Sequence, residues 1–211
     1  MSKHLVVFDV DSTLIEEEAI ELLAEFSGTR EQVAEITARA MAGEIDFGTS
    51  LVERVSLLEG LSESVLAEVA ASLTPTKGAQ ELISLIHETD GYAAAVSGGF
   101  IQLLGPLKKQ LGLDFAKANT LEVVDGKLTG KITGELVDST VKAETLLALV
   151  HKLEIENQRT IAIGDGANDL TMMKVAGLSI AFCAKQIVRD QADVVLDVRD
   201  LSLVAAFLPN G

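Results

Sequence analysis

Short apolar runs alternate along the chain with segments of helical periodicity. The first run, Leu5 to Phe8, is continuously apolar, as in a buried parallel strand, and it ends at Asp9. Four more runs of this kind lie at 92–96, 160–163, 178–181 and 194–196. Helical patterns separate them, at about 78–88, 100–111, 140–153, 168–175, 185–190 and 200–207. This alternation predicts an α/β fold, a doubly wound, Rossmann-like parallel sheet with ligands beyond the carboxyl ends of its strands.

Residues 15–75 interrupt the alternation, because they show only helical periodicity. The helical patterns there lie at 17–26, 30–42, 48–58 and 62–72. We therefore expect a small helical cap at 15–75, inserted after the first strand of a core formed by 1–14 and 76–211. Farther along, Asp125-Gly126 separates two short apolar-rich segments, 121–124 and 127–132, and this predicts a hairpin turn.

Composition and charge narrow the classes of partner. Among 211 residues, 32 are Asp or Glu and 17 are Lys or Arg, which gives a formal charge of −15. Neither a nucleic acid nor an anionic membrane would be attracted to such a protein. The single cysteine, Cys183, allows no internal disulfide, and no Cys/His cluster suggests zinc. The N-terminal apolar run is too short for a signal peptide or a membrane span, so we expect a cytoplasmic protein. We also expect a monomer or a homodimer.

Two carboxylates follow the first strand, in Asp9-Val10-Asp11-Ser12-Thr13. A carboxylate nucleophile beside a second carboxyl that can carry a proton suits phosphoryl transfer. Strand-end acids can also be solvated turn residues.

A second acidic strand end, Gly164-Asp165-Gly166-Ala167-Asn168-Asp169, favours the chemical interpretation. Because parallel strands end at one edge, Asp9, Asp11 and Asp165 can converge into an oxygen site suited to Mg²⁺. The alternative is that Asp165 is a turn residue and Asn168 or Asp169 only a helix cap.

A third strand end carries Ser97-Gly98-Gly99, whose hydroxyl and exposed N–H groups at a helix start could bind an anion. The same sequence is also common in ordinary loops. Lys142 begins the helical pattern at 140–153 and could neutralise a phosphate, although in isolation it resembles a solvated lysine.

In the cap, Arg54 falls on the same helical face as Leu51, Val55 and Leu58. An arginine on an apolar stripe is costly unless it reaches water or an anion, and its planar fork suits a carboxylate. A structural pair with Glu53, Glu59 or another acid is the alternative.

Together these segments resemble the haloacid dehalogenase superfamily of aspartate-nucleophile phosphatases. The sequences D-V-D-S-T, S-G-G, a downstream lysine and G-D-G-A-N-D occur in the order typical of that superfamily, and the resemblance covers nearly the whole chain. The cap, with Glu18, R-V-S-L-L and T-P-T-x-G, resembles that of the members that act on phosphoserine. The resemblance implies an Mg²⁺-dependent phosphomonoesterase that hydrolyses O-phospho-L-serine in serine biosynthesis.

The resemblance also implies roles for particular residues. Asp9 would be the nucleophile and Asp11 the proton donor, and the metal would be held by Asp9, Asp165 and the backbone oxygen of Asp11. Glu18 would receive the substrate ammonium group and Arg54 its carboxylate. The remaining implied substrate-binding residues are Met41, Phe47, Ser97, Gly98, Gly99, Lys142 and Asn168, with Asp169 and Thr13 in supporting roles.

Other functions remain open from the sequence. The nearest is a related phosphatase or phosphotransferase for another small phosphate ester. A non-catalytic protein that binds a phosphorylated metabolite is a different class, but binding alone does not require Asp9, Asp11, Lys142 and Asp165 together.

Overall fold

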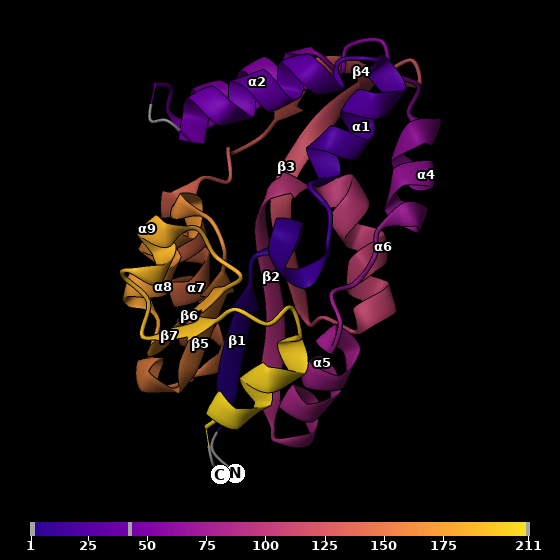
Figure 1. Cartoon of the computed structure of the whole chain (residues 1–211). Helices are drawn as coiled ribbons and strands as arrows, with labels where there is room; N and C mark the ends of the chain where they lie inside the picture. Colours follow the sequence, from indigo (N-terminus) through magenta and orange to yellow (C-terminus); the bar gives the residue numbers. More distant parts are fainter. Residues whose placement is uncertain (1–2, 42–43, 210–211) are drawn as a thin grey trace.

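The computed structural model describes residues 3–41 and 44–209 (Figure 1). Its sheet has the order β4-β3-β2-β1-β5-β6-β7, in which all neighbours are parallel except β3 and β4. The strands are β1 (His4–Phe8), β2 (Gly91–Phe100), β3 (Phe115–Val124), β4 (Lys127–Thr133), β5 (Thr160–Gly164), β6 (Leu178–Phe182) and β7 (Val194–Leu196). The expected doubly wound α/β fold and its five parallel strands are confirmed.

Successive side chains of β1 point to opposite faces of the sheet, and both of these faces are buried. Val6 and Phe8 belong to the apolar cluster on one face, and Leu5 and Val7 to that on the other. The first face is covered by α5 (Ala79–Glu88), α6 (Ile101–Leu111) and the 3₁₀ helix η4 (Leu201–Phe207). The second is covered by α7 (Ser139–Leu153), α8 (Leu170–Val175) and α9 (Gln186–Arg189). No described helix is long and apolar enough to cross a membrane.

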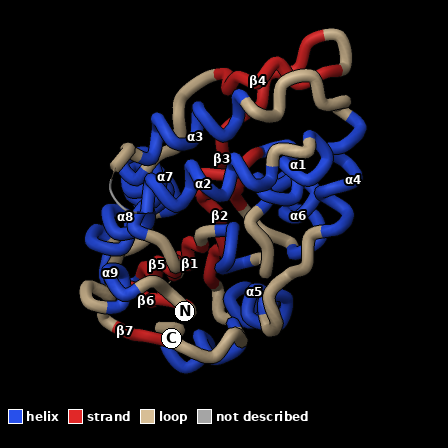
Figure 2. The backbone as a smooth tube through the Cα atoms, turned by 45° about the horizontal axis from the view of Figure 1, so that its top comes forward, coloured by secondary structure: helices blue, strands red, loops and turns tan. Residues whose placement is uncertain are grey.

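Between β1 and α5 the described chain forms four α-helices, which lie beyond the carboxyl end of β1 (Figures 1 and 2). They are α1 (Ala19–Ser27), α2 (Arg30–Met41), α3 (Phe47–Ser56) and α4 (Ser64–Ser72). The two connections to these helices run side by side, since Glu16 donates to the Thr74 carbonyl and Thr76 to that of Leu14. We call residues 15–75 the cap and the rest the core; that the cap is a domain of its own stays a prediction.

The predicted hairpin exists, and it joins the cap to the core. Asp125 and Gly126 both have positive φ, as a two-residue hairpin turn of type I′ requires. The tip of the hairpin packs against the cap, where Leu128 exchanges backbone hydrogen bonds with Gly60 and Leu61.

The sequence pattern misses the first half of β3, because these residues are only partly buried and their mixed polarity hides the strand. The helical pattern at 200–207 is a 3₁₀ helix rather than an α-helix.

Candidate active site

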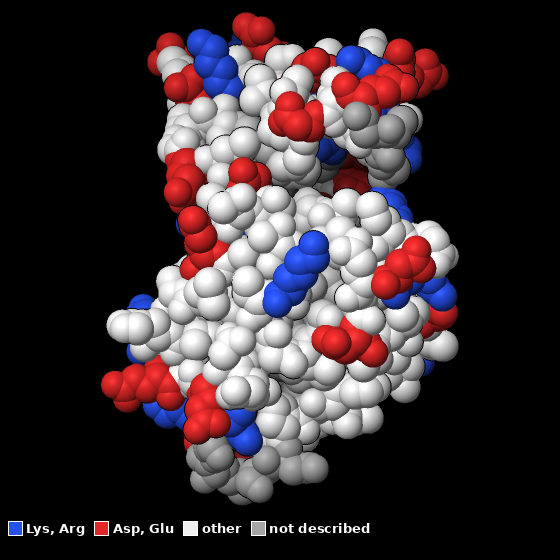
Figure 3. Space-filling model, turned by 90° about the vertical axis from the view of Figure 1, so that its left-hand side faces the viewer, with Lys and Arg blue, Asp and Glu red and all other residues white. Residues whose placement is uncertain are grey.

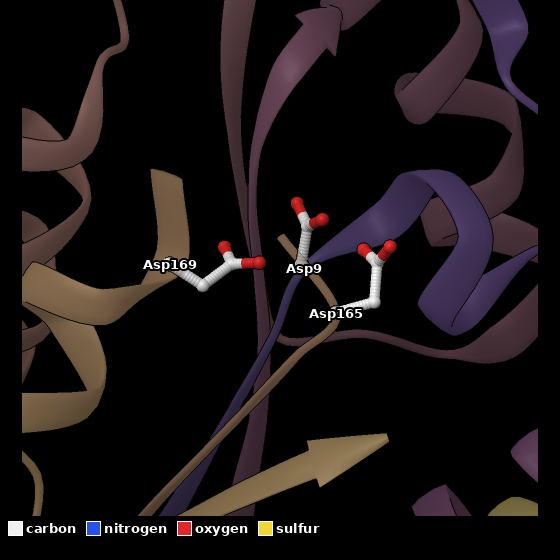
Figure 4. A group of neighbouring side chains, drawn as sticks. All are labelled: Asp9, Asp165 and Asp169. Atoms are coloured by element: carbon white, nitrogen blue, oxygen red, sulfur yellow. The ribbon is translucent and has the colours of Figure 1, made fainter. Parts of the chain in front are cut away.

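Carboxylates from two adjacent strand ends meet at the edge of the sheet below the cap (Figure 4). Asp9 follows β1 and Asp165 follows β5, and the Asp9 N–H donates to the Ile163 carbonyl of β5 at 2.9 Å. Asp169 lies in the short 3₁₀ helix η3 (Ala167–Asp169). Oxygen atoms of Asp9, Asp165 and Asp169 all lie within 4.8 Å of one another. The convergence expected from parallel topology is therefore present for Asp9 and Asp165, but the third carboxylate of the cluster is Asp169 and not the expected Asp11.

Lys142 is fully buried behind this cluster. Its ammonium group donates to Asp9 Oδ1 at 2.6 Å and to Asp169 Oδ1 at 2.7 Å. Burial alone would lower the pKa of Lys142, but the carboxylates of Asp169 and Asp9 outweigh it and raise that pKa above its usual value. The alternative of a solvated lysine is wrong, because the side chain of Lys142 is 0% exposed.

One lysine does not balance the negative charge that the fold gathers here. Burial, together with the charges of Asp169, Asp165 and Asp11, raises the pKa of Asp9 well above its ordinary value despite Lys142. Burial and the nearby Asp169 raise the pKa of Asp165 to about 6. Such crowding of buried carboxylates is costly unless a cation joins them.

The cluster suits a hard divalent cation, and its members are not equivalent. Asp169 is already engaged, since Lys142 binds Oδ1 and the Gly166 N–H donates to Oδ2 at 3.1 Å. Asp165 makes no side-chain hydrogen bond to a described residue, and Asp9 uses only Oδ1. Asp9 and Asp165 are thus the carboxylates best able to act as ligands, while Asp169 holds Lys142.

Asp11 lies in η1 (Val10–Leu14), an irregular turn of π-helical hydrogen bonding. Its Oδ1 accepts the N–H of Ala19, the first residue of α1, at 2.7 Å. Its Oδ2 accepts the hydroxyl of Ser97 at 3.3 Å. Burial raises the pKa of Asp11, while the Ala19 hydrogen bond and Lys142 oppose the rise. A held carboxyl with a raised pKa is equipped to give and take a proton.

The two glycines after Ser97 are needed for close contacts. A Cβ on Gly98 would lie 2.5 Å from the ring tip of Phe47, and one on Gly99 would lie 2.7 Å from Asp11 Oδ2. Gly98 therefore lets a cap aromatic side chain approach the core, and Gly99 leaves room for the Asp11 carboxyl.

A cavity of about 510 Å³ lies between the cap and this sheet edge. Asp9, Asp11, Asp165 and Asn168 line it from the core, and Glu18, Phe47 and Arg54 line it from the cap. In Figure 3 the surface is hollowed between the two parts, with charged groups inside the hollow. Ser97, Lys142, Thr13 and Asp169 are buried and do not line the cavity. Met41 ends α2, and its side chain lies outside the described part of the structure.

The cap wall presents one cation and one acid. Arg54 is 9% exposed and donates from Nε to the Ser50 carbonyl at 3.2 Å. It forms no ion pair with a described residue, and Glu53 binds Arg39 instead, so the pairing with Glu53 or Glu59 is wrong. Glu18 accepts the Ser12 hydroxyl at 2.7 Å. Burial and the nearby Asp11 raise the pKa of Glu18 to about 7.

Lys185 also lines the cavity, and the sequence pattern did not single it out. Its backbone N–H donates to the Asp165 carbonyl at 3.1 Å, and its charge lowers the pKa of both Asp165 and Glu18, opposing their upward shifts. The signal was available, because Lys185 follows β6 at the same carboxyl edge of the sheet.

The fold and the site define a hydrolase of the haloacid dehalogenase-like family, and residues 3–177 match that family. The chain is 49% identical to a Streptomyces coelicolor phosphoserine phosphatase over 98% of its own length, but it spans only 50% of that protein. It is 48% identical to the Streptococcus thermophilus phosphoserine phosphatase, covering 98% of this chain and 96% of the relative.

A solved structure of a phospho-aspartyl intermediate analogue of phosphoserine phosphatase superposes with a TM-score of 0.94. It is 42% identical, over 99% of this chain and 100% of the other. The chain belongs to the phosphoserine phosphatase family.

Proposed function

We propose that the protein is an Mg²⁺-dependent phosphatase that hydrolyses O-phospho-L-serine to L-serine and phosphate. The observation that carries the proposal is the charge pattern of the cavity, in which Arg54 and Glu18 face it from the cap and Asp9 from the core. A phosphate ester with one carboxylate and one ammonium group matches this pattern. The phosphoryl group would meet the core, and the two amino-acid groups would meet the cap.

Asp9 is the proposed nucleophile. One of its oxygens attacks phosphorus, the bond from phosphorus to the serine oxygen breaks, and an aspartyl phosphate forms. Asp11 gives its proton to the departing serine oxygen. Asp11 then takes a proton from the water that attacks the aspartyl phosphate, and this releases phosphate and restores Asp9.

Lys142 fixes the orientation of Asp9 through the 2.6 Å contact and adds positive charge beside the reacting phosphoryl group. Ser97, Gly98, Gly99 and Asn168 are proposed to bind the phosphoryl oxygens. A bound Mg²⁺, held by Asp9, Asp165 and the backbone oxygen of Asp11, would offset the negative charge of the phosphate.

Recognition falls to the cap. A substrate ammonium group beside Glu18 favours the ionised carboxylate, which burial and Asp11 otherwise disfavour. The N–H groups of Arg54 other than Nε are available for a two-pronged bond to the carboxylate. Phe47 and Met41 are proposed to complete the pocket. The cytoplasmic location and the choice between monomer and homodimer stay predictions.

The test is phosphate release from a small panel of esters, with the purified protein stripped of metal and then supplied with Mg²⁺, Mn²⁺ or Ca²⁺. We expect phospho-L-serine to have the highest kcat/KM, above phosphoethanolamine, which lacks the carboxylate, and p-nitrophenyl phosphate, which lacks both groups. Mg²⁺ should restore the activity. A higher kcat/KM for an ester without the amino-acid groups, or full activity in the metal-free protein, would refute the proposal.

A further inference from the structure

The turn between Asp11 and Glu18 depends on a residue in an unusual conformation. Ser12 has φ of 56°, in the left-handed region that residues other than glycine rarely adopt. Its N–H donates to the Glu17 carbonyl at 3.1 Å, and its hydroxyl donates to Glu18 Oε1 at 2.7 Å. Both bonds are local, so they do not tie Ser12 itself to the core, although the neighbouring Asp11 and Leu14 are bonded to Ser97 and Thr76.

Arg199 makes that tie from 187 residues away in the sequence. Its Nη1 donates to the Ser12 carbonyl at 3.0 Å. Within the described part of the chain, this is the one hydrogen bond to Ser12 from outside residues 9–19. The guanidinium also lies over the ring of Phe182, 6.0 Å from its centroid, and that ring is fully buried at the end of β6. Arg199 is exposed, and its contact with Phe182 favours the orientation in which the side chain reaches the turn.

We propose that Arg199 is a positioning residue for substrate recognition: by holding the Ser12 carbonyl, it fixes the Ser12 hydroxyl and thereby the carboxylate of Glu18. The role in recognition rests on the proposed function, because Glu18 is there the receptor for the substrate ammonium group. The structural part, that Arg199 holds the turn, does not depend on it.

The effect should fall on Glu18 rather than on Asp11. Asp11 has two hydrogen bonds that do not involve Ser12, from the Ala19 N–H and from the Ser97 hydroxyl. Glu18 has the Ser12 hydroxyl as its only side-chain hydrogen bond to a described residue. Loss of Arg199 should therefore weaken substrate binding while leaving the proton donor in place.

The experiment compares Arg199→Ala, Arg199→Lys and the control Arg189→Ala. Arg189 pairs with Asp197, two residues before Arg199, so its loss loosens the same segment without touching the turn. We expect Arg199→Ala to raise KM for phosphoserine about ten-fold, equivalent to about 1.4 kcal/mol, with kcat changed less than two-fold. Turnover of p-nitrophenyl phosphate should change less than two-fold. Arg199→Lys, which can still donate to the carbonyl, should recover most of the loss, and Arg189→Ala should resemble the wild type.

Hydrogen–deuterium exchange of the free protein tests the structural part separately. We expect the peptide that spans residues 10–18 to exchange faster in Arg199→Ala and not in Arg189→Ala. Unchanged exchange overturns the proposal, as does an equal loss for both substrates. If Arg199→Ala does not fold, the test uses Arg199→Lys instead. A loss of activity in Arg199→Lys that is as large for p-nitrophenyl phosphate as for phosphoserine also overturns the proposal. If the wild type releases no phosphate from phosphoserine, the proposed function fails, while the exchange experiment still decides whether Arg199 holds the turn.

Discussion

Replacement of Arg54 by alanine is the sharpest test of substrate recognition. The guanidinium carries five N–H donors, and the structure commits only Nε, to the Ser50 carbonyl. Burial lowers the pKa of Arg54, although the charges of Glu18 and Asp11 oppose this shift and the group stays cationic. A substrate carboxylate would therefore meet a largely dehydrated cation with donors to spare.

The expected loss follows from that environment. Removal of one partner from a buried, hydrogen-bonded charge pair costs about 2–5 kcal/mol. At about 1.4 kcal/mol for each factor of ten, Arg54→Ala should lower kcat/KM for phosphoserine about 30-fold to 4,000-fold. Arg54→Lys keeps the charge but not the planar fork, so it should recover only part of the loss.

The assay measures kcat/KM for phosphoserine and for p-nitrophenyl phosphate with each variant. Arg39→Ala is the matched control, because Arg39 is also a cap arginine but pairs with Glu53 at 3.4 Å and is 42% exposed. Such an exposed pair contributes about 0–1 kcal/mol, so this variant should remain close to the wild type. Equal losses for the two substrates in Arg54→Ala would refute the reasoning and make Arg54 a structural residue or a phosphate ligand.

Three further outcomes are expected. Asp9→Asn should abolish turnover and leave the melting temperature within a few degrees of the wild type; near-normal turnover would exclude the covalent route. Gly99→Ala should lower kcat for both substrates, since its Cβ would lie 2.7 Å from Asp11 Oδ2, and unchanged kcat would contradict this. Burial lowers the pKa of His4, whose ring nitrogens have no hydrogen-bond partner in the described structure, so the folded state binds a proton less readily than the unfolded state. Relative to His4→Leu, which cannot titrate at this position, the wild type should therefore lose stability in urea as the pH drops below about 6.5.

The sheet and the acidic cluster could be predicted because they depend on local patterns. An apolar run followed by an acid marks a buried strand end, and parallel topology brings Asp9 and Asp165 to one edge. The cap was recognisable for the same reason, since its helices interrupt the strand–helix alternation. Arg54 was recognisable because it falls on an apolar helical stripe, and the structure buries it.

Contacts between distant segments that strand topology does not dictate could not be predicted. Lys142 looks solvated in the sequence, but in the fold it is buried and bonded to Asp9 and Asp169, 133 and 27 residues away. The contact between Gly98 and Phe47 and that between Arg199 and Ser12 depend on how the cap and the C-terminal segment lie on the core. No periodicity in the sequence records these placements, because each partner is compatible with its own element in many arrangements.

The residues proposed for substrate recognition and those proposed for the chemistry lie in different parts of the chain, with one exception. Glu18, Phe47 and Arg54 lie in the cap, whereas Asp9, Lys142 and Asp165 lie in the core. Substitutions in the two groups should therefore act separately on substrate choice and on turnover. Asp11 is the exception, because the Ala19 N–H of the cap and the Ser97 hydroxyl of the core hold the same carboxyl. A shift of the cap relative to the core must then move or release this carboxyl, so we expect the proposed proton-transfer step to require the cap in place over the substrate.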